Sequence, residues 1–205
     1  MKKFDLKYLS KEITILAGVD EVGRGPLAGP VVAAAVIFDN ETIIEGINDS
    51  KKLSEKERER LSKIIKEKCL AYSFGVIDQN EIDEINILQA TLKAMKQAVE
   101  SLSVTPQIIL IDGNKSFVTN TAVETIVKGD SKSFSIAAAS ILAKVKRDSM
   151  MKKAALEYPE YFWEKNKGYG TKQHIEAIKK YGTTPLHRQT FLRKILSEEI
   201  QEALF

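Results

Sequence analysis

The chain has 205 residues, of which 43% are hydrophobic and 29% charged, values that are typical of a soluble globular protein with one substantial domain. The longest apolar stretch, residues 31–38, is too short to cross a bilayer, and residues 1–7 lack the apolar core of a secretory signal. Cys69 is the single cysteine, which excludes an internal disulfide and suits a reducing compartment. We therefore expect a cytoplasmic monomer without a membrane segment.

The basic residues are unevenly distributed, although the formal net charge is only +3. Residues 128–194 contain fifteen Lys and Arg against six Asp and Glu. Such a surplus suits a polyanionic partner, through phosphate contacts and counterion release. Solvated helix faces would explain the same surplus without a partner, so charge alone leaves both interpretations open.

The first half of the chain predicts three strands and two helices. Apolar runs over residues 13–19 and 30–38 predict consecutive strands joined by a glycine-rich turn. A serine N-cap followed by acidic residues predicts a helix over residues 55–68. Alternation predicts a strand over residues 70–77, and apolar residues at helical spacing predict a helix over residues 86–102.

The second half predicts two strands and three helices. Short apolar runs over residues 107–111 and 123–127 predict the strands. A long helix is expected over residues 131–151, where a run of small residues allows close packing on a sheet. Further helices over residues 171–181 and 188–204 form a C-terminal helical extension.

These elements predict an α/β fold, in which a mixed five-stranded sheet is flanked by helices. We expect one main domain over residues 1–157. The helical extension, residues 158–205, is expected to pack on that domain and to form one structural unit with it.

Four acidic residues follow the predicted strands. Asp20 and Glu21 come after the first strand, Asp112 after the fourth and Asp130 after the fifth. Ligand sites of open α/β sheets collect at strand ends, so we expect these carboxylates to converge. A cluster of oxygen ligands without His or Cys suits Mg²⁺ or Mn²⁺, and two such ions promote phosphoryl transfer without a side-chain nucleophile.

Each acid also has a structural interpretation. Asp112 with Gly113 forms a common turn pair, and Asp130 is a possible N-cap of the following helix. Asp20 and Glu21 are neighbours, and neighbours on a regular strand point to opposite faces. Both serve one site only if the strand ends or bulges there.

The glycine-rich turn contains Gly23, Arg24 and Gly25. Glycine lets the backbone approach a ligand closely, and the arginine adds a positive charge for phosphate. Residues 23–28 also fit the Gly-x-Gly-x-x-Ala fingerprint of dinucleotide-binding proteins, but that motif requires a helix to begin there. Because residues 31–38 are predicted as a strand, we reject this alternative. No Gly-Lys-Ser or Gly-Lys-Thr occurs, which excludes a phosphate-binding loop of the nucleoside-triphosphatase type.

Six groups of motifs occur in an order that resembles bacterial type 2 ribonuclease H (ribonuclease HII). The resemblance covers nearly the whole chain. The motifs are residues 18–32, 49–54, 111–113, 128–130, 135–148, and 168–171 together with His174 and residues 184–188.

The resemblance implies a metal-dependent endonuclease with the ribonuclease H fold. Such enzymes cut the RNA strand of RNA–DNA hybrids and nick duplex DNA 5′ of an embedded ribonucleotide, leaving 3′-hydroxyl and 5′-phosphate ends. By position, the metal-binding acids are Asp20, Glu21, Asp112 and Asp130. The loop that reads the ribose 2′-hydroxyl is Gly23, Arg24 and Gly25, and the tyrosine that stacks on the following sugar is Tyr169.

Further substrate contacts are expected from polar residues in the remaining motifs. Ser50 and Lys51 lie in a polar loop, where the lysine is a candidate phosphate ligand. Lys144 and Arg147 lie on the long helix, although Arg147 has Asp148 and Glu157 as alternative partners.

Residues in the C-terminal region give further expectations. His174 and His187 do not form a ligand pair, and we expect hydrogen-bonding or substrate-side roles for them. Phe162 and Trp163 are interpreted as core anchors of the extension.

The last five residues, 201–205, resemble the short peptides that dock on bacterial sliding clamps. Gln201, Leu204 and Phe205 fit that pattern, whereas Glu202 replaces the usual leucine. Alternatively, Leu204 and Phe205 pack on the domain itself.

A non-catalytic module that binds RNA–DNA hybrids is the remaining alternative for the whole chain. Loss of one metal-binding acid would mark such a module. All four acids are present, so catalysis is the stronger hypothesis.

Overall fold

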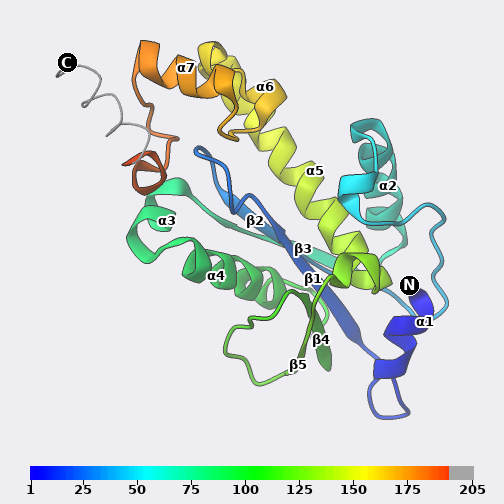
Figure 1. Cartoon of the computed structure of the whole chain (residues 1–205). Coiled ribbons are helices and arrows are strands. Elements are labelled where there is room, and N and C mark those ends of the chain that lie inside the picture. The colour runs from blue at the N-terminus through cyan, green and yellow to red at the C-terminus, as the bar shows by residue number, and fades with distance from the viewer. Residues whose placement is uncertain (194–205) are drawn as a thin grey trace.

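A mixed five-stranded sheet forms the centre of the computed structural model, which describes residues 1–193 (Figure 1). The strands lie in the order β3-β2-β1-β4-β5. Strand β1 pairs antiparallel with β2 and parallel with β4, so the predicted mixed sheet is confirmed. The strands are β1 Leu16–Val22, β2 Val31–Ile37, β3 Ala71–Ile77, β4 Ile108–Asp112 and β5 Ala122–Ile126.

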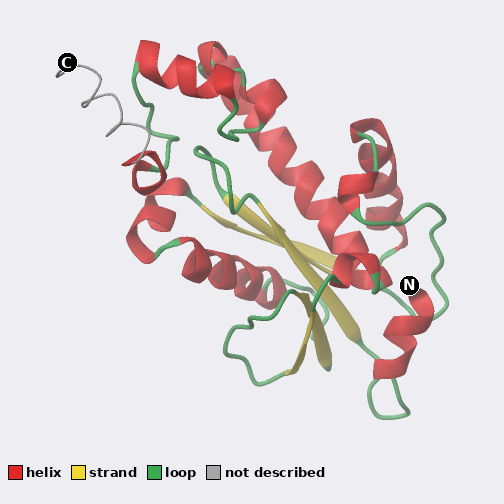
Figure 2. Ribbon diagram, in the orientation of Figure 1, coloured by secondary structure: helices red, strands yellow, loops and turns green. Residues whose placement is uncertain are grey.

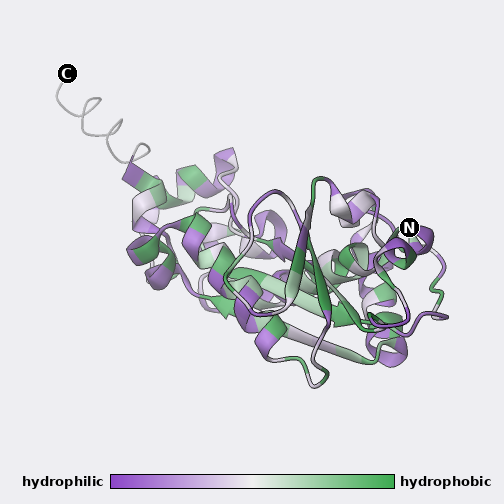
Figure 3. Ribbon diagram, turned by 90° about the horizontal axis from the view of Figure 1, so that it is seen from below, coloured by the Kyte–Doolittle hydropathy of each residue, from purple (hydrophilic) through white to green (hydrophobic). Residues whose placement is uncertain are grey.

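Helices cover both faces of this sheet (Figures 1 and 2). Helix α4, Ile87–Glu100, packs on one face, while α2, Glu55–Lys68, and α5, Phe134–Glu157, pack on the other. Figure 3 shows the strands mostly green and the helices mixed, as expected for helices with one buried face. The shorter helices are α1 Lys2–Asp5, α3 Gln79–Ile85, α6 Trp163–Asn166 and α7 Lys172–Tyr181.

Four 3₁₀ turns lie between these elements. They are η1 Leu6–Tyr8, η2 Ser50–Lys52, η3 Gly129–Ser131 and η4 Pro159–Tyr161. None of the helices in residues 1–193 is long and apolar enough to span a membrane.

Helix α5 approaches β1 closely because of Gly18. A Cβ built on Gly18 would lie 2.2 Å from the carbonyl carbon of Ser135, so any side chain there would push the helix away. The helix begins at a serine cap, since the Ser133 hydroxyl accepts a hydrogen bond from the Ile136 amide at 3.1 Å. This close packing brings the α5 side chains to the sheet edge where the acids lie.

The C-terminal region packs on α5 and on the β1–β2 loop through a separate apolar cluster. Trp163 and Leu192 are fully buried there with Ala28 and Met151, which confirms Trp163 as a core anchor. Phe162 is only partly buried. The backbone is helical over residues 189–193, and the rest of the helix predicted over residues 188–204 lies outside the described residues. The division at residue 157, where α5 ends, stays a prediction.

Several predicted boundaries are wrong, and tertiary pairing explains them. Strand β1 continues to Val22 because its ladder with β2 extends to the pair Val22 and Val32. Helix α5 starts only at Phe134, since residues 129–131 form a 3₁₀ turn, and it runs on to Glu157. The short helix α3 was not predicted, although Asp78 caps it by accepting from the amides of Asn80 and Glu81.

Candidate active site

Two of the four acids lie side by side on the face of the sheet that α5 covers. The parallel register pairs Val19 with Ile111, so the next residues, Asp20 and Asp112, are neighbours on adjacent strands. Asp20 is 5% exposed and paired with Ala34, whose side chain packs in the α2–α5 cluster. Asp112 is the last residue of β4. The fold therefore brings these two carboxylates together, as predicted.

Asp20 lies inside β1 and not after its end, and the same correction of the sequence-based expectation applies to Glu21. Glu21 pairs with Ala33 inside β1, and its side chain starts on the α4 face, opposite to Asp20. Its Oε1 lies 3.4 Å from Nη1 of Arg24, while its Oε2 is buried without a hydrogen-bond partner. Since β1 ends one residue later, this carboxylate still lines the same cavity as Asp20.

Asp130 lies in the 3₁₀ turn after β5 and is 7% exposed. Its Oδ2 is 3.6 Å from Nζ of Lys51, and the amide of the preceding Gly129 donates to Oδ1 of Asp112 at 2.6 Å. The cap of α5 is Ser133, so the interpretation of Asp130 as the helix N-cap is wrong. The turn instead holds Asp130 next to the end of β4.

Burial and mutual repulsion make this cluster costly to ionise. Burial raises the pKa of Asp20, and the carboxylates of Glu21 and Asp112 raise it further. Burial also raises the pKa of Glu21 against the opposing effect of Arg24, and it raises the pKa of Asp112. Burial alone would lower the pKa of Lys51, but the surrounding carboxylates, Asp130 first, raise it.

The donor set fits a hard divalent cation. All four groups are carboxylates, the Glu21 Oε2 atom is buried without a partner, and three of the four pKa values are raised. The carboxylates do not yet form a complete metal-binding geometry, however. Over residues 1–193, no group of three or more His, Cys, Asp or Glu side chains is already arranged to hold a metal.

A cavity of about 180 Å³ collects most of the predicted site residues. Asp20, Glu21 and Asp112 line it with predicted substrate contacts from three other segments. Those contacts are Ser50, Lys51, Lys144 and Tyr169. Three segments that are far apart in the sequence therefore meet the carboxylates of β1 and β4 in this cavity.

Three residues of this cavity were not predicted as site residues, namely Val22, Arg58 and Ser140. The Ser140 hydroxyl opposes the rise in the pKa of Asp20, and its Oγ lies 2.8 Å from Oγ of Ser50. Its position in the small-residue run of α5 was interpreted only as packing. A polar residue inside an apolar helical run was the signal available in the sequence.

Lys144 also lines the cavity, but its charge is already paired. Its Nζ lies 2.7 Å from Oδ1 of Asp148, one helical turn away. Lys51 also lies near a carboxylate, 3.6 Å from Oδ2 of Asp130, but its side chain is 84% exposed against 22% for Lys144. Of the two lysines, Lys51 is therefore the freer one to meet a phosphate.

The prediction that Arg147 contacts substrate is wrong. Its side chain is fully buried, and it donates to the carbonyl oxygens of Pro30, Lys167 and Ala28 at 2.9, 2.9 and 3.1 Å. It pairs with neither of the acids considered as alternatives. Its place on the buried side of α5, which packs against the β1–β2 loop, leaves backbone oxygens as its partners.

The two glycines of the loop have different surroundings. Gly23 has φ of +96°, and a Cβ there would lie 2.3 Å from Nε of Arg147. Gly25 is exposed, and a Cβ there would meet only Cε1 of Tyr169, at 3.7 Å. Arg24 and Tyr169 are exposed beside it, Tyr169 at 42%. Strand β2 follows this loop without a helix, which agrees with the rejection of a dinucleotide-binding fingerprint.

His174 and His187 form a buried pair and face no substrate. Nε2 of His174 lies 3.2 Å from Nε2 of His187 and accepts from Nε1 of Trp163 at 3.0 Å. Both side chains are at most 1% exposed. Of the two roles considered, hydrogen bonding is therefore the one that the structure supports.

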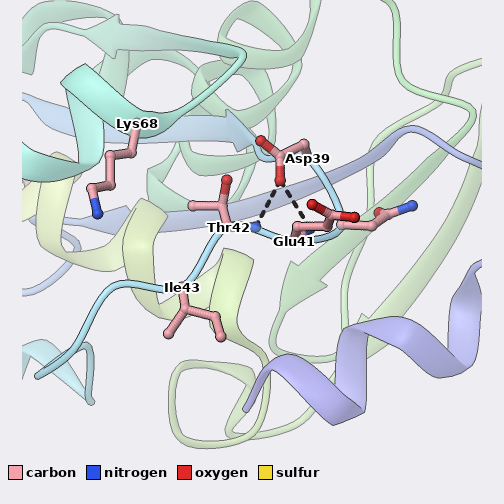
Figure 4. Close-up of a pocket in the computed structure, with 6 residues that line it drawn as sticks. Asp39, Glu41, Thr42, Ile43 and Lys68 are labelled. Atoms are coloured by element: carbon pink, nitrogen blue, oxygen red, sulfur yellow. Dashed lines mark hydrogen bonds between the residues drawn. The ribbon is translucent and has the colours of Figure 1, made fainter.

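A larger hollow of about 820 Å³ lies elsewhere on the surface (Figure 4). It is lined by Lys68 and by residues 39–43, which follow the far end of β2. Asp39 is used there to hold a turn, since its Oδ1 accepts from the amides of Glu41 and Thr42. None of the four acids lines this hollow, so its size does not indicate the active site.

The sheet order, with acidic residues at the ends of its strands, fits the ribonuclease H-like class of folds. A family model described as Ribonuclease HII matches residues 17–194. The chain belongs to the ribonuclease HII family, as the sequence motifs predicted.

Relatives and solved structures agree with this assignment. Ribonuclease HII of Caldanaerobacter subterraneus subsp. tengcongensis is 54% identical over 196 residues, covering 96% of this chain and 81% of the relative. The Endomicrobium trichonymphae enzyme is 57% identical, covering 92% and 90%. The crystal structure of ribonuclease H2 from Pyrococcus horikoshii superposes with a TM-score of 0.75 at 30% identity, covering 90% and 98%. A complex of PCNA with RNase HII from Archaeoglobus fulgidus gives a TM-score of 0.66 at 25% identity, covering 85% and 94%.

This chain is therefore an endoribonuclease that acts on the RNA strand of RNA–DNA hybrids, as predicted. Ribonucleases H depend on divalent metal ions, in agreement with the donor set described above.

Proposed function

We propose that this enzyme nicks duplex DNA on the 5′ side of an embedded ribonucleotide and leaves 3′-hydroxyl and 5′-phosphate ends. The observation that supports this most directly is the cavity where three carboxylates meet Tyr169, next to the exposed Gly25 backbone. A site for hydrolysis and a site for reading one sugar are thus adjacent. The preference between Mg²⁺ and Mn²⁺ is left open by these residues, since both ions take oxygen ligands.

Asp20, Glu21, Asp112 and Asp130 are proposed to hold two divalent ions. When bound there, such ions activate a water molecule for attack and stabilise the oxyanion that leaves. Ser140 orients the Asp20 carboxylate, and the Gly129 amide orients that of Asp112. Lys51 is placed to bind a substrate phosphate near Asp130.

Recognition of the ribonucleotide is assigned to the loop and the tyrosine. The 2′-hydroxyl distinguishes RNA from DNA at one position, and a site built to bond it can reject the sugar that lacks it. Gly25 allows the backbone to approach this hydroxyl, and the Tyr169 ring offers a flat surface for the next deoxyribose. The exposed Arg24 guanidinium lies beside them for a phosphate contact.

The test uses a labelled DNA duplex with one ribonucleotide beside the same duplex made of DNA alone. With Mg²⁺ or Mn²⁺ we expect one cut 5′ of the ribonucleotide, and no cut with a chelator or in the DNA control. Cleavage of a long RNA–DNA hybrid in the same preparation is the positive control. Hybrid cleavage without a cut at the single ribonucleotide would overturn the proposal, whereas binding without any cleavage would favour the non-catalytic module.

We also propose that residues 201–205 bind a bacterial sliding clamp. These residues lie outside the described part of the chain, so their sequence carries the proposal together with one related protein. That protein is the Archaeoglobus fulgidus ribonuclease HII, which forms a complex with PCNA. Deleting residues 201–205 should abolish clamp pull-down while nicking is retained, and the substitution Glu202→Ala, outside the Leu-Phe anchor, serves as the control. Unchanged pull-down after the deletion would refute clamp binding by this peptide.

A further inference from the structure

A second buried arginine, Arg188, donates hydrogen bonds to the loop between β1 and β2. Figure 1 shows this loop at the end of the blue strands, reaching the orange C-terminal segment. Arg188 is 0% exposed. Its guanidinium donates to the carbonyl oxygens of Gly23 at 2.6 Å, of Arg24 at 3.0 Å and of Gly29 at 2.8 and 3.0 Å.

Arg147 binds the other end of the same loop. It donates to the carbonyl oxygens of Ala28 and Pro30, and also to that of Lys167, two residues before Tyr169. The Leu27 amide donates to the Gly168 carbonyl at 2.8 Å. The loop and the segment that carries Tyr169 are therefore fixed relative to each other.

The arrangement of these carbonyls dictates where the amides point. No peptide bond of the described chain is cis, and in a trans peptide the carbonyl oxygen and the next N–H point in opposite directions. Because the Gly23 and Arg24 carbonyls point inward to Arg188, the amides of Arg24 and Gly25 point outward. Within residues 1–193, neither of these two amides donates a hydrogen bond to the protein.

The outward face of Gly25 has no structural explanation inside the protein. Its φ lies outside the left-handed region, and its missing side chain would clash with nothing. Glycine is required here only if something outside the chain comes close to the backbone. Two free amide donors and a bare Cα thus lie on the side of the loop that points away from Arg188, next to Tyr169.

We propose that Arg188 is a positioning residue for ribonucleotide recognition, which turns the Arg24 and Gly25 amides toward the 2′-hydroxyl of the substrate, with Arg147 fixing the far end of the loop. This inference rests on the proposed function, because it names the group that orients the loop. Arg188 touches no substrate itself. It acts through the peptide planes that it holds.

A purely structural role for Arg188 would not require a buried guanidinium group. Neither Arg147 nor Arg188 forms an ion pair with an acid of the described chain, so two like charges are buried together on neutral carbonyl oxygens. A buried charge of this kind costs free energy that apolar packing would avoid. What the guanidinium offers instead is a rigid fork of donors, which a flexible ammonium group cannot reproduce.

The experiment measures recognition separately from general binding. With Mg²⁺ present, KM is determined for the duplex with one ribonucleotide, and Ki for the all-DNA duplex as a competitor. For Arg188→Lys we expect the ratio of Ki to KM to fall about tenfold, while Ki itself stays within about twofold. Arg147→Lys should lower the ratio in the same direction but less, because its carbonyl partners lie farther from Gly25.

Leu192→Ala is the matched control, because Leu192 is equally buried in the same region but bonds nothing in the loop. It should lose stability and keep the wild-type ratio. If Arg188→Lys keeps the ratio, or if KM and Ki rise together, the positioning role is refuted while ribonucleotide nicking by the wild type still stands. If the wild type does not nick at the ribonucleotide, the proposed function itself fails. Should Arg188→Lys not fold, an unchanged ratio in Arg147→Lys refutes the role.

Discussion

The carboxylate end of the sheet and the loop bound by Arg147 and Arg188 both contain buried charges. They differ in whether those charges have hydrogen-bond partners within the protein. Asp20, Glu21 and Asp112 repel one another, and Glu21 Oε2 has no partner. In contrast, the guanidinium of Arg188 makes four hydrogen bonds and that of Arg147 three, all to backbone oxygens. The carboxylates lack partners that a bound ligand would supply. The guanidinium groups already have theirs, and they fix the shape of the loop that the ligand contacts.

The two regions also respond to pH in opposite directions. A carboxyl whose pKa is raised by folding binds its proton more tightly in the folded state, so its contribution to stability declines as pH rises. Behind the loop, the pKa of the buried His187 is lowered, so stability there declines as pH falls. The carboxylate cluster therefore destabilises the fold at neutral pH without a cation, and the histidine behind the loop destabilises it in acid.

The largest expected effect comes from Asp20→Asn. The amide keeps the shape but removes a ligand charge, so kcat for nicking should fall about a thousandfold. Removing the buried charge should also remove carboxylate repulsion from the metal-free protein. We therefore expect Tm in EDTA to rise by about 2–4 °C. Nicking assays and thermal unfolding with and without Mg²⁺ measure both effects.

Asp39→Asn is the control for that substitution, because Asp39 is exposed and lies at the far end of β2. It should change neither kcat nor the response of Tm to Mg²⁺. Near-normal turnover in Asp20→Asn would refute the assignment of Asp20 to the metal site. A lower Tm in EDTA would show instead that its carboxylate is well satisfied.

A second prediction concerns acid and His187. Burial first, and then repulsion from His174, lowers the pKa of His187 to about 4 from its usual 6.5. Between these values the unfolded chain binds a proton that the folded chain does not, so the free energy of unfolding falls with pH. The loss attributable to His187 reaches about 3 kcal/mol at its lower end. Urea unfolding of the wild type and of His187→Asn at pH 7.5 and 4.5 gives the difference.

Comparing the two proteins cancels the opposite trend of the carboxylates. The stability gap between them should shrink or reverse toward pH 4.5, because the variant has no imidazole to protonate. A gap that stays constant across this range would mean that His187 titrates equally in the folded and unfolded chains. The tight packing against Trp163 and His174 would then not exclude the proton.

The sheet was predictable because its strands are short apolar runs, and the acids were predictable because each lies near a strand end. The exact end of β1 was not, because it is set by pairing with β2, so Glu21 starts on the opposite face from Asp20. Helix α3 was missed because a seven-residue amphipathic segment carries little periodic signal.

The buried arginines were the main failure of the sequence analysis. Arg147 was predicted to meet substrate, and Arg188 was quoted within a motif without a role. Apart from the Lys167 carbonyl, which is 20 residues from Arg147, their partners are carbonyl oxygens 117 to 165 residues away, which no local pattern reveals. One signal was present for Arg147: Ala143 and Met151, four residues before and after it, are apolar, so the arginine lies on the buried side of its helix.

The smallest expected effect separates the two glycines of the loop. Gly25→Ala should fold with stability within about 0.5 kcal/mol of the wild type, because its backbone suits any residue and its new Cβ meets only Tyr169 at an ordinary distance. Its kcat/KM for the ribonucleotide duplex should fall about tenfold, since the methyl group stands where the sugar approaches. Gly23→Ala is the comparison, because its φ of +96° and the contact with Arg147 should destabilise the fold itself, by about 1–3 kcal/mol. If Gly25→Ala nicks normally, the backbone at residue 25 is not approached by substrate, and the outward amides that Arg188 holds would have no sugar to read.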